Sequence, residues 1–238
     1  MILAYDTETT GLPDWHKPSD APHQPHVIQI AMIRQDMQGK ELDRFSSIVR
    51  PGPGAVMEPE AFDAHGISLE QAMDEGVCPI EVTERFIDWA GQAQLMVGHN
   101  ESFDRRLMRI SAARHLGFKW EPTAPSFCTL YRSKFIINLP PTTKMVAAGF
   151  SGPKAPKLEE AVHFFFGEEL EGAHDATVDV EASLRLMWHL INECGVAMFK
   201  TARSATPRGP RVSRKAVTGT GHAADPFAAA KLALDSAQ

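Results

Sequence analysis

The chain has 238 residues, of which 43% are hydrophobic, and a formal net charge of -6 at pH 7. This length allows one large domain or two small ones, and this share of apolar residues excludes wholesale disorder. No apolar stretch approaches the roughly 18 residues of a membrane span, and we expect no secretory signal because the first residues lack a basic segment. The 3 cysteines lie far apart and predict neither a disulfide framework nor a zinc ligand pair, so we expect a reducing, cytoplasmic compartment.

The charges are distributed unevenly along the chain. Residues 1–199 hold 17 Lys and Arg against 28 Asp and Glu, whereas residues 200–238 hold 7 against 2. Inside the acidic part, residues 105–157 hold 10 basic residues and a single acid, Glu121. A solvated surface explains such a stretch, and so does a polyanion that is held beside an acidic site.

The first third of the chain predicts strands. Residues 1–5, 27–33 and 45–49 are short apolar runs, and the second run is rich in β-branched residues. Between the first two runs, residues 11–26 hold 4 prolines, which predicts a loop. A further short apolar run at 95–98 predicts a fourth strand.

Helical spacing dominates the rest of the chain. It predicts helices over residues 79–90, 102–116 and 158–166, and a longest helix over about 175–194. Three sequential strands followed by helix, strand and helix predict an α/β sheet with a crossover. The carboxyl ends of the first and fourth strands would then open on one crevice, the usual ligand position in such sheets.

The end of the chain differs in composition from the rest. We expect a domain over residues 1–195 and a flexible basic tail over 196–238, because residues 200–223 hold few large apolar side chains. Asp225 and Pro226 are a good N-cap and first helical residue, so a short helix over 226–235 is predicted to form against a partner. A disordered end without a partner is the alternative.

Carboxylates from separate segments are expected to meet at the predicted crevice. Asp6 and Glu8 are two residues apart at the end of the first strand and so point the same way. Asp104 follows the fourth strand, and Asp179 lies near the start of the longest helix. Taken singly, each has an ordinary explanation as a solvated acid or a helix-dipole partner. Together they repel one another, which favours a hard divalent cation such as Mg²⁺ or Mn²⁺.

In order and context, these segments resemble the motifs of the DEDDh 3′–5′ exonuclease family, and most closely its proofreading branch. The matches are Asp-x-Glu-Thr-Thr-Gly-Leu at residues 6–12, His-Asn-x-x-Phe-Asp at 99–104 and His-Asp-Ala-x-x-Asp at 174–179. Residues 59–67 resemble the family stretch that meets the terminal nucleotide. The resemblance covers about residues 1–192 and implies a ribonuclease H-like fold, an α/β domain whose mixed five-stranded sheet is flanked by helices.

The resemblance also implies roles for the acidic residues. Asp6, Glu8 and Asp179 would ligate two Mg²⁺ or Mn²⁺ ions, and Asp104 would join through water. His174 would be the general base of a hydrolysis, provided that it lies in the loop before the longest helix and so converges with Asp179.

Contacts with the substrate are implied for five further residues, which are Thr7, Thr9, Glu60, His65 and Phe103. The sequence departs from the family at Gln29, where many relatives have Glu, and in an enlarged connection over residues 138–157. These departures bear on the shape of the substrate and not on the chemistry.

The expected reaction is hydrolysis of the 3′-terminal phosphodiester of DNA, with release of nucleoside monophosphates, in proofreading or repair. The expected partners are a single-stranded or frayed 3′ end of DNA and, through the tail, a DNA polymerase subunit. One alternative is a 3′-trimming exonuclease that acts on RNA or oligoribonucleotides. Another is a non-catalytic nucleic-acid-binding module, against which the repulsive acid cluster argues.

Overall fold

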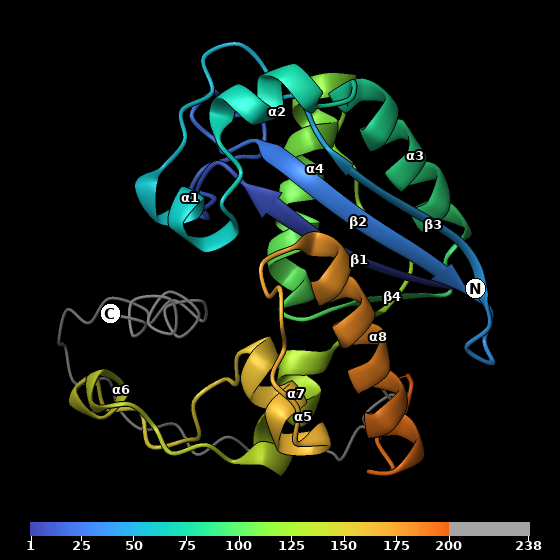
Figure 1. Cartoon of the computed structure of the whole chain (residues 1–238), viewed down its shortest axis with the longest axis vertical. Helices are drawn as coiled ribbons and strands as arrows, with labels where there is room; N and C mark the ends of the chain where they lie inside the picture. The colour runs from blue at the N-terminus through green and yellow to red at the C-terminus, as the bar shows by residue number, and fades with distance from the viewer. Residues whose placement is uncertain (200–238) are drawn as a thin grey trace, which may run out of the picture.

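A computed structural model describes residues 1–199 of the chain. The predicted helix over 226–235, and most of the predicted tail, lie outside the described residues. At the centre is a five-stranded sheet in the order β3-β2-β1-β4-β5 (Figure 1). Its strands are β1 (Ile2–Thr9), β2 (Val27–Gln35), β3 (Glu41–Ile48), β4 (Leu95–Gly98) and β5 (Ser126–Cys128).

The sheet is mixed. β1 pairs with β2, and β2 with β3, in antiparallel register, whereas β4 runs parallel to β1 and β5 parallel to β4. The mixed five-stranded sheet implied by the resemblance is therefore confirmed. Residue patterning alone predicted the first four strands but not β5, which has 3 residues.

Helices cover both faces of the sheet, and β1 divides its side chains between them. Ile2 and Ala4 pack toward α5 (Thr129–Ile137), α7 (Leu158–Phe166) and α8 (Ala176–Asn192). Leu3 and Tyr5 pack on the other face toward α3 (Pro79–Gln92) and α4 (Glu101–Leu116). Because successive side chains of a strand alternate, Asp6 and Glu8 continue the α8 side and Thr7 continues the α4 side.

Three short helices lie outside these layers, and the sequence pattern predicted neither them nor α5. They are α1 (Pro59–His65), α2 (Leu69–Glu75) and α6 (Thr143–Ala147), and α6 stands apart from the sheet in Figure 1. Local signals define them instead of an apolar face. Pro59 opens α1 and Gly66, with φ 71°, ends it, while the Ser68 hydroxyl accepts a hydrogen bond from the Gln71 amide at the start of α2.

The packed region continues past α8. The Val196 amide donates to the Leu190 carbonyl oxygen at 2.9 Å, and Met198 packs against the core on the α8 side. Contacts therefore run beyond residue 195, where the sequence placed the end of the domain, and that boundary stays a prediction. Within residues 1–199, no helix is both long and apolar enough to cross a membrane.

Candidate active site

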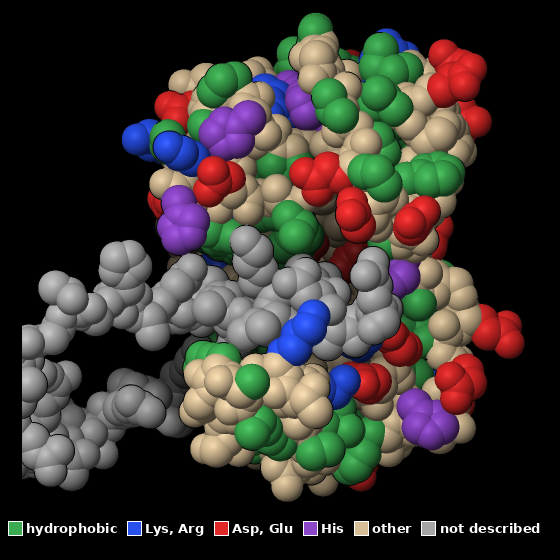
Figure 2. Space-filling view, turned by 90° about the vertical axis from the view of Figure 1, so that its left-hand side faces the viewer, with side chains coloured by type: hydrophobic (Ala, Val, Ile, Leu, Met, Phe, Trp, Pro, Cys, Tyr) green, Lys and Arg blue, Asp and Glu red, His purple; other side chains and the backbone are tan. Residues whose placement is uncertain are grey.

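Carboxylates from β1 and α8 meet at the carboxyl end of β1. In the ladder with β2, Asp6 lies opposite Ala31 and Glu8 opposite Gln29, and the register shifts directly after Glu8. The Glu8 carboxylate, the His174 imidazole and the Asp179 carboxylate offer ligand atoms that all lie within 4.8 Å of one another. In Figure 2, several Asp and Glu side chains gather on the upper part of the face shown.

Asp104 joins this group from the opposite face of the sheet. It lies in the first turn of α4 and is 3% exposed. Its Oδ1 accepts hydrogen bonds from the Thr7 amide at 3.0 Å and the Thr7 hydroxyl at 2.7 Å. Thr7 stands between Asp6 and Glu8 on β1, so this pair of bonds fixes α4 against the strand that carries the other two acids.

The start of α8 brings His174 to Asp179. Asp175 is the N-cap, and its Oδ1 accepts from the Thr177 amide at 2.8 Å. His174 lies just before it with φ 69°, and its backbone amide donates to Asp179 Oδ2 at 3.2 Å. His174 therefore sits in the loop and Asp179 inside the helix, which is the arrangement that their convergence requires.

Burial and mutual repulsion perturb the acids. Burial, together with the charges of Asp179 and Asp104, raises the pKa of Glu8 to about 9. Burial raises the pKa of Asp104 to about 8 against the opposing hydrogen bonds from Thr7, and it raises the pKa of Asp179 to about 6. The pKa of Asp6 also lies well above its usual value, through burial and the neighbouring acids. The cluster therefore retains protons at neutral pH unless a cation compensates its charge.

The donor set fits divalent cations. Asp179 Oδ1 is buried and has no hydrogen-bond partner among residues 1–199, and leaving a buried charged acceptor without a partner is costly. A metal ion at this position would satisfy the oxygen and neutralise the cluster. Carboxylate oxygens with no thiolate ligand suit Mg²⁺ or Mn²⁺ better than Zn²⁺.

His65 and Thr9 shape the wall of the site near α1. His65 Nδ1 accepts from the Ile67 amide at 3.0 Å, so its Nε2 carries the proton and donates to the Thr9 carbonyl oxygen at 3.1 Å. The Thr9 hydroxyl donates to the Gly11 carbonyl oxygen at 2.6 Å. Burial lowers the pKa of His65, and the nearby His174 lowers it further, so His65 is a neutral donor next to the acid cluster.

The other residues expected to contact the substrate lie on different elements. Glu60 is exposed in the first turn of α1, and Phe103 packs on the core of the α4 face. The Thr7 hydroxyl is engaged by Asp104. A contact of the five residues with a nucleotide stays a prediction.

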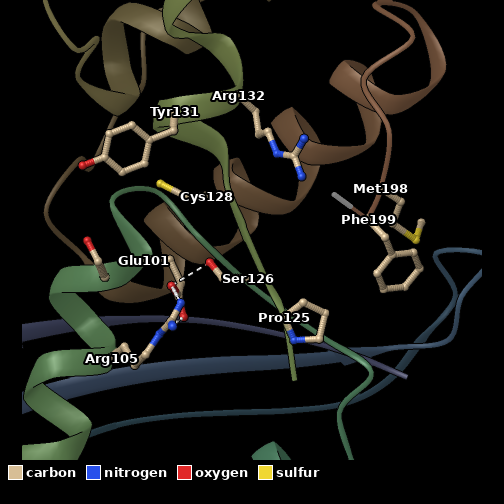
Figure 3. A pocket seen from close by; sticks show the side chains of 10 residues that line it. Glu101, Arg105, Pro125, Ser126, Cys128, Tyr131, Arg132, Met198 and Phe199 are labelled. Carbon is tan, nitrogen blue, oxygen red and sulfur yellow. Dashed lines mark hydrogen bonds and ion pairs between the residues drawn. The ribbon is translucent and has the colours of Figure 1, made fainter. Parts of the chain in front are cut away.

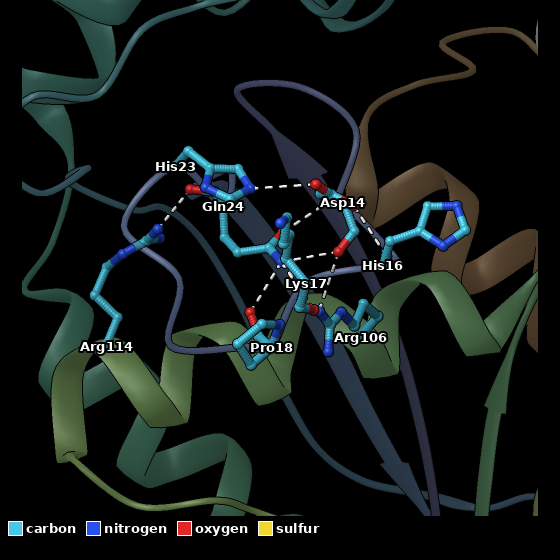
Figure 4. A network of polar contacts seen from close by, with 8 residues as sticks. All are labelled: Asp14, His16, Lys17, Pro18, His23, Gln24, Arg106 and Arg114. Carbon is cyan, nitrogen blue, oxygen red and sulfur yellow. Dashed lines mark hydrogen bonds and ion pairs between the residues drawn. The ribbon is translucent and has the colours of Figure 1, made fainter.

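Arginines of α4 brace the long loop over residues 11–26 (Figure 4). Arg106 donates to the Ser19 hydroxyl at 2.7 Å and the Asp14 carbonyl oxygen at 3.2 Å, and Arg114 donates to the Pro25 carbonyl oxygen at 2.7 Å. Gln24, which is 2% exposed, cross-links the loop from inside through the Asp14 backbone. These arginines belong to the basic stretch, but they stabilise the protein's own loop.

Sequence reasoning missed the role of Gln29. Its Oε1 accepts from the Ala176 amide at 3.1 Å, and its Nε2 donates to Asp175 Oδ2 at 3.3 Å. Gln29 thus ties β2 to the first turn of α8, directly behind Glu8. The available signal was its departure from the family's Glu, which showed that the position differs but not what it contacts.

The chain also matches known proteins. A family model described as Exonuclease (RNase_T) matches residues 3–187. DNA polymerase III subunit epsilon of Salmonella typhimurium is 32% identical over 103 residues, which cover 43% of this chain and 39% of that protein. DNA polymerase III PolC-type of Listeria welshimeri is 24% identical over 190 residues, 79% of this chain and 11% of that protein.

Solved structures give the same fold. Exonuclease I of E. coli in complex with a dT13 oligonucleotide superposes with a TM-score of 0.60 at 19% identity, over 80% of this chain and 41% of that chain. Exonuclease I of Methylocaldum szegediense gives a TM-score of 0.60 at 20% identity, over 81% of this chain and 41% of that chain. This chain thus spans about two fifths of these proteins and of the epsilon subunit. Because the family model matches most of its length, the chain belongs to the exonuclease family.

Proposed function

We propose that this chain is a metal-dependent 3′–5′ exonuclease that removes nucleoside monophosphates from the 3′ end of single-stranded or frayed DNA, in proofreading or repair. The observation that carries the proposal is the convergence of Glu8, His174 and Asp179 within 4.8 Å, with Asp104 fixed beside them by Thr7. A protein that only binds nucleic acid has no use for acids whose pKa values repulsion and burial have raised.

Each residue has a part in the proposed reaction. Asp6, Glu8 and Asp179 would hold two Mg²⁺ or Mn²⁺ ions, and Asp104 would join through water. When bound, the ions would supply Lewis-acid stabilisation of the charge that develops on the phosphate and the leaving oxygen. His174 is exposed, so its imidazole can reach the attacking water and accept its proton, while its backbone amide keeps the loop against Asp179.

Matches to DNA polymerase III subunits support DNA as the substrate. The structural likeness to an exonuclease I that holds an oligonucleotide supports a single-stranded 3′ end. A DNA polymerase subunit as a partner of the tail, and the cytoplasmic location, stay predictions.

The test compares three substrates of one base sequence, which are linear single-stranded DNA, circular single-stranded DNA and linear RNA. We expect Mg²⁺-dependent release of mononucleotides from the linear DNA, at a higher rate than from RNA, and no attack on the circle. Cleavage of the circle would show endonuclease action, and faster release from RNA would reassign the substrate. Release that persists in a chelator would contradict the metal site.

A further inference from the structure

We propose that one face of α5 binds the single strand behind its 3′-terminal nucleotide. This face, called the α5 face below, consists of Tyr131 and Phe135 with the flanking cation Lys134. The inference deepens the proposed function and rests on it, because it assigns a path to the substrate that the crevice would cut.

The aromatic part of the α5 face is unusually exposed. Phe135 is 74% exposed, more than any other aromatic side chain within residues 1–199, and Tyr131 is 51% exposed. They are four residues apart on a helix and so lie on the same side of it. Two large exposed aromatic side chains on one helix face are typical of a binding surface, and every base offers a flat ring that can stack on them.

The charge around these rings suits a polyanion. Residues 129–157 hold 5 basic residues and no acid. Lys154 and Lys157 are paired with Glu160 and Glu159.

Arg132 and Lys134 form no ion pair with any described residue. Lys134 Nζ lies 5.8 Å from the centre of the Phe135 ring, and the Arg132 guanidinium lies 5.0 Å from the centre of the Phe127 ring. Arg132 Nη2 is buried without a hydrogen-bond partner among the described residues, so Lys134 is the cation of the α5 face that remains available for a phosphate. The α5 face therefore combines two rings that can stack on bases with a cation beside them, a combination that suits single-stranded nucleic acids.

The structure gives different partners to the basic residues of the stretch 105–157. On α4, Arg106 and Arg114 brace the loop over residues 11–26, Arg105 pairs with Glu101, and Arg109 pairs with Glu121. These arginines compensate the protein's own acids and carbonyl groups. On α5, by contrast, Lys134 forms no ion pair with any described residue and remains for a phosphate backbone.

The α5 face reaches toward the first turn of α4, next to the candidate active site. Tyr131 and Arg132 line a cavity of about 720 Å³ together with Glu101 and Ser102 from the first turn of α4, the same turn that carries Asp104. Figure 3 shows Tyr131 and Arg132 leaving α5 in different directions above the start of α4. A strand that leaves the crevice past Ser102 would meet Tyr131 first and Phe135 about 6 Å further along the helix.

The experiment uses the full chain and the double variant Tyr131→Ala/Phe135→Ala. Phe118→Ala is the matched control, because Phe118 is also an exposed aromatic, at 45%, but follows the far end of α4. Binding of 5′-labelled dT12 and dT2 is measured by fluorescence anisotropy with Ca²⁺ in place of Mg²⁺, and hydrolysis of dT2 is measured with Mg²⁺. Loss of one stacked base typically lowers affinity by roughly 5- to 150-fold.

We expect the double variant to bind dT12 at least tenfold more weakly and to hydrolyse dT2 at the wild-type rate, with Phe118→Ala unchanged in both. Tyr131→Phe/Phe135→Tyr, which keeps both rings, should restore dT12 binding. Lys134→Ala should flatten the salt dependence of dT12 binding by about 0.7 in log–log slope.

Wild-type affinity of the double variant for dT12 would overturn the inference, and so would an equal loss in Phe118→Ala or a parallel loss of dT2 hydrolysis. A self-association of the wild type that the double variant abolishes, with dT12 binding unchanged, would assign the α5 face to a second copy of the chain. If the wild type binds dT12 through the α5 face but hydrolyses neither oligonucleotide, the proposed function fails and the binding surface stands.

Discussion

Replacing Asp179 by Asn tests the electrostatic account of the acid cluster. Burial raises the pKa of this carboxyl from 3.8 to about 6, so the folded metal-free protein holds a proton that the unfolded chain releases. This contribution to stability is fully present below about pH 4 and is lost as the pH rises through about 6. An Asn at this position stays neutral at every pH and keeps an oxygen that can accept from the His174 amide. Its contribution to stability therefore does not fall as the pH rises.

The size of the effect follows from the same pKa values. The difference between 3.8 and about 6 corresponds to about 3 kcal/mol at roughly 1.4 kcal/mol per pKa unit. At pH 8 and without metal, Asp179→Asn should therefore be more stable than the wild type by up to about 3 kcal/mol. In a domain of this size, that raises the melting temperature by roughly 6–12 °C. At pH 4 the two proteins should melt together.

The assay is thermal unfolding at pH 4 and pH 8 in a chelator, repeated at pH 8 with increasing Mg²⁺. The matched control is Asp74→Asn, which neutralises an exposed acid on α2. It should change the melting temperature little at either pH. Mg²⁺ should raise the melting temperature of the wild type by mass action and that of Asp179→Asn far less. A variant that is less stable than the wild type at pH 8 in chelator, or that gains equally from Mg²⁺, would refute the reasoning.

Three further substitutions test the proposed general base, the contact between β2 and α8, and the bracing of the loop over residues 11–26. His174→Ala should lower turnover by roughly 100-fold or more while Mg²⁺ still raises its melting temperature; loss of that rise would make His174 a ligand instead. Gln29→Met removes the acceptor of the Ala176 amide and should cost about 1–3 kcal/mol of stability, seen by denaturant unfolding, and unchanged stability and turnover would dismiss the contact. Arg114→Ala should speed proteolysis within residues 11–26, mapped by mass spectrometry, and an unchanged cleavage rate would show that the loop holds its own shape.

Elements with a clear apolar pattern were predictable from the sequence, including the 4-residue β4, whereas α5, β5 and the three short helices were not. The apolar run over residues 27–33 lies within β2. The helix predicted over about 175–194 matches α8 to within two residues at each end. β5 was not predicted because a strand of 3 residues is too short to show the alternation of apolar and polar residues. β5 forms because it pairs with β4, and because Phe127, at 0% exposed, fills the core between α5 and α8.

The site was predictable in its acids but not in its supports. Spacing alone placed Asp6 and Glu8 on one side of a strand, and the family motifs supplied the partners. The bridge from Gln29 to Asp175 joins positions 146 residues apart and depends on the register of β2 against α8, which no local pattern encodes. The bracing of the loop by Arg114 is hidden for the same reason, because a sequence shows that a basic residue is present but not which carbonyl group it meets.

The most direct test of the central claim is the product analysis of a 5′-labelled single-stranded DNA, with the wild type and Asp179→Asn in Mg²⁺ and in chelator. The account predicts stepwise shortening from the 3′ end and free mononucleotides with the wild type in Mg²⁺. It predicts no products in chelator, and a rate at least 100-fold lower with Asp179→Asn in Mg²⁺. Internal fragments, shortening in chelator or near-wild-type hydrolysis by Asp179→Asn would contradict it.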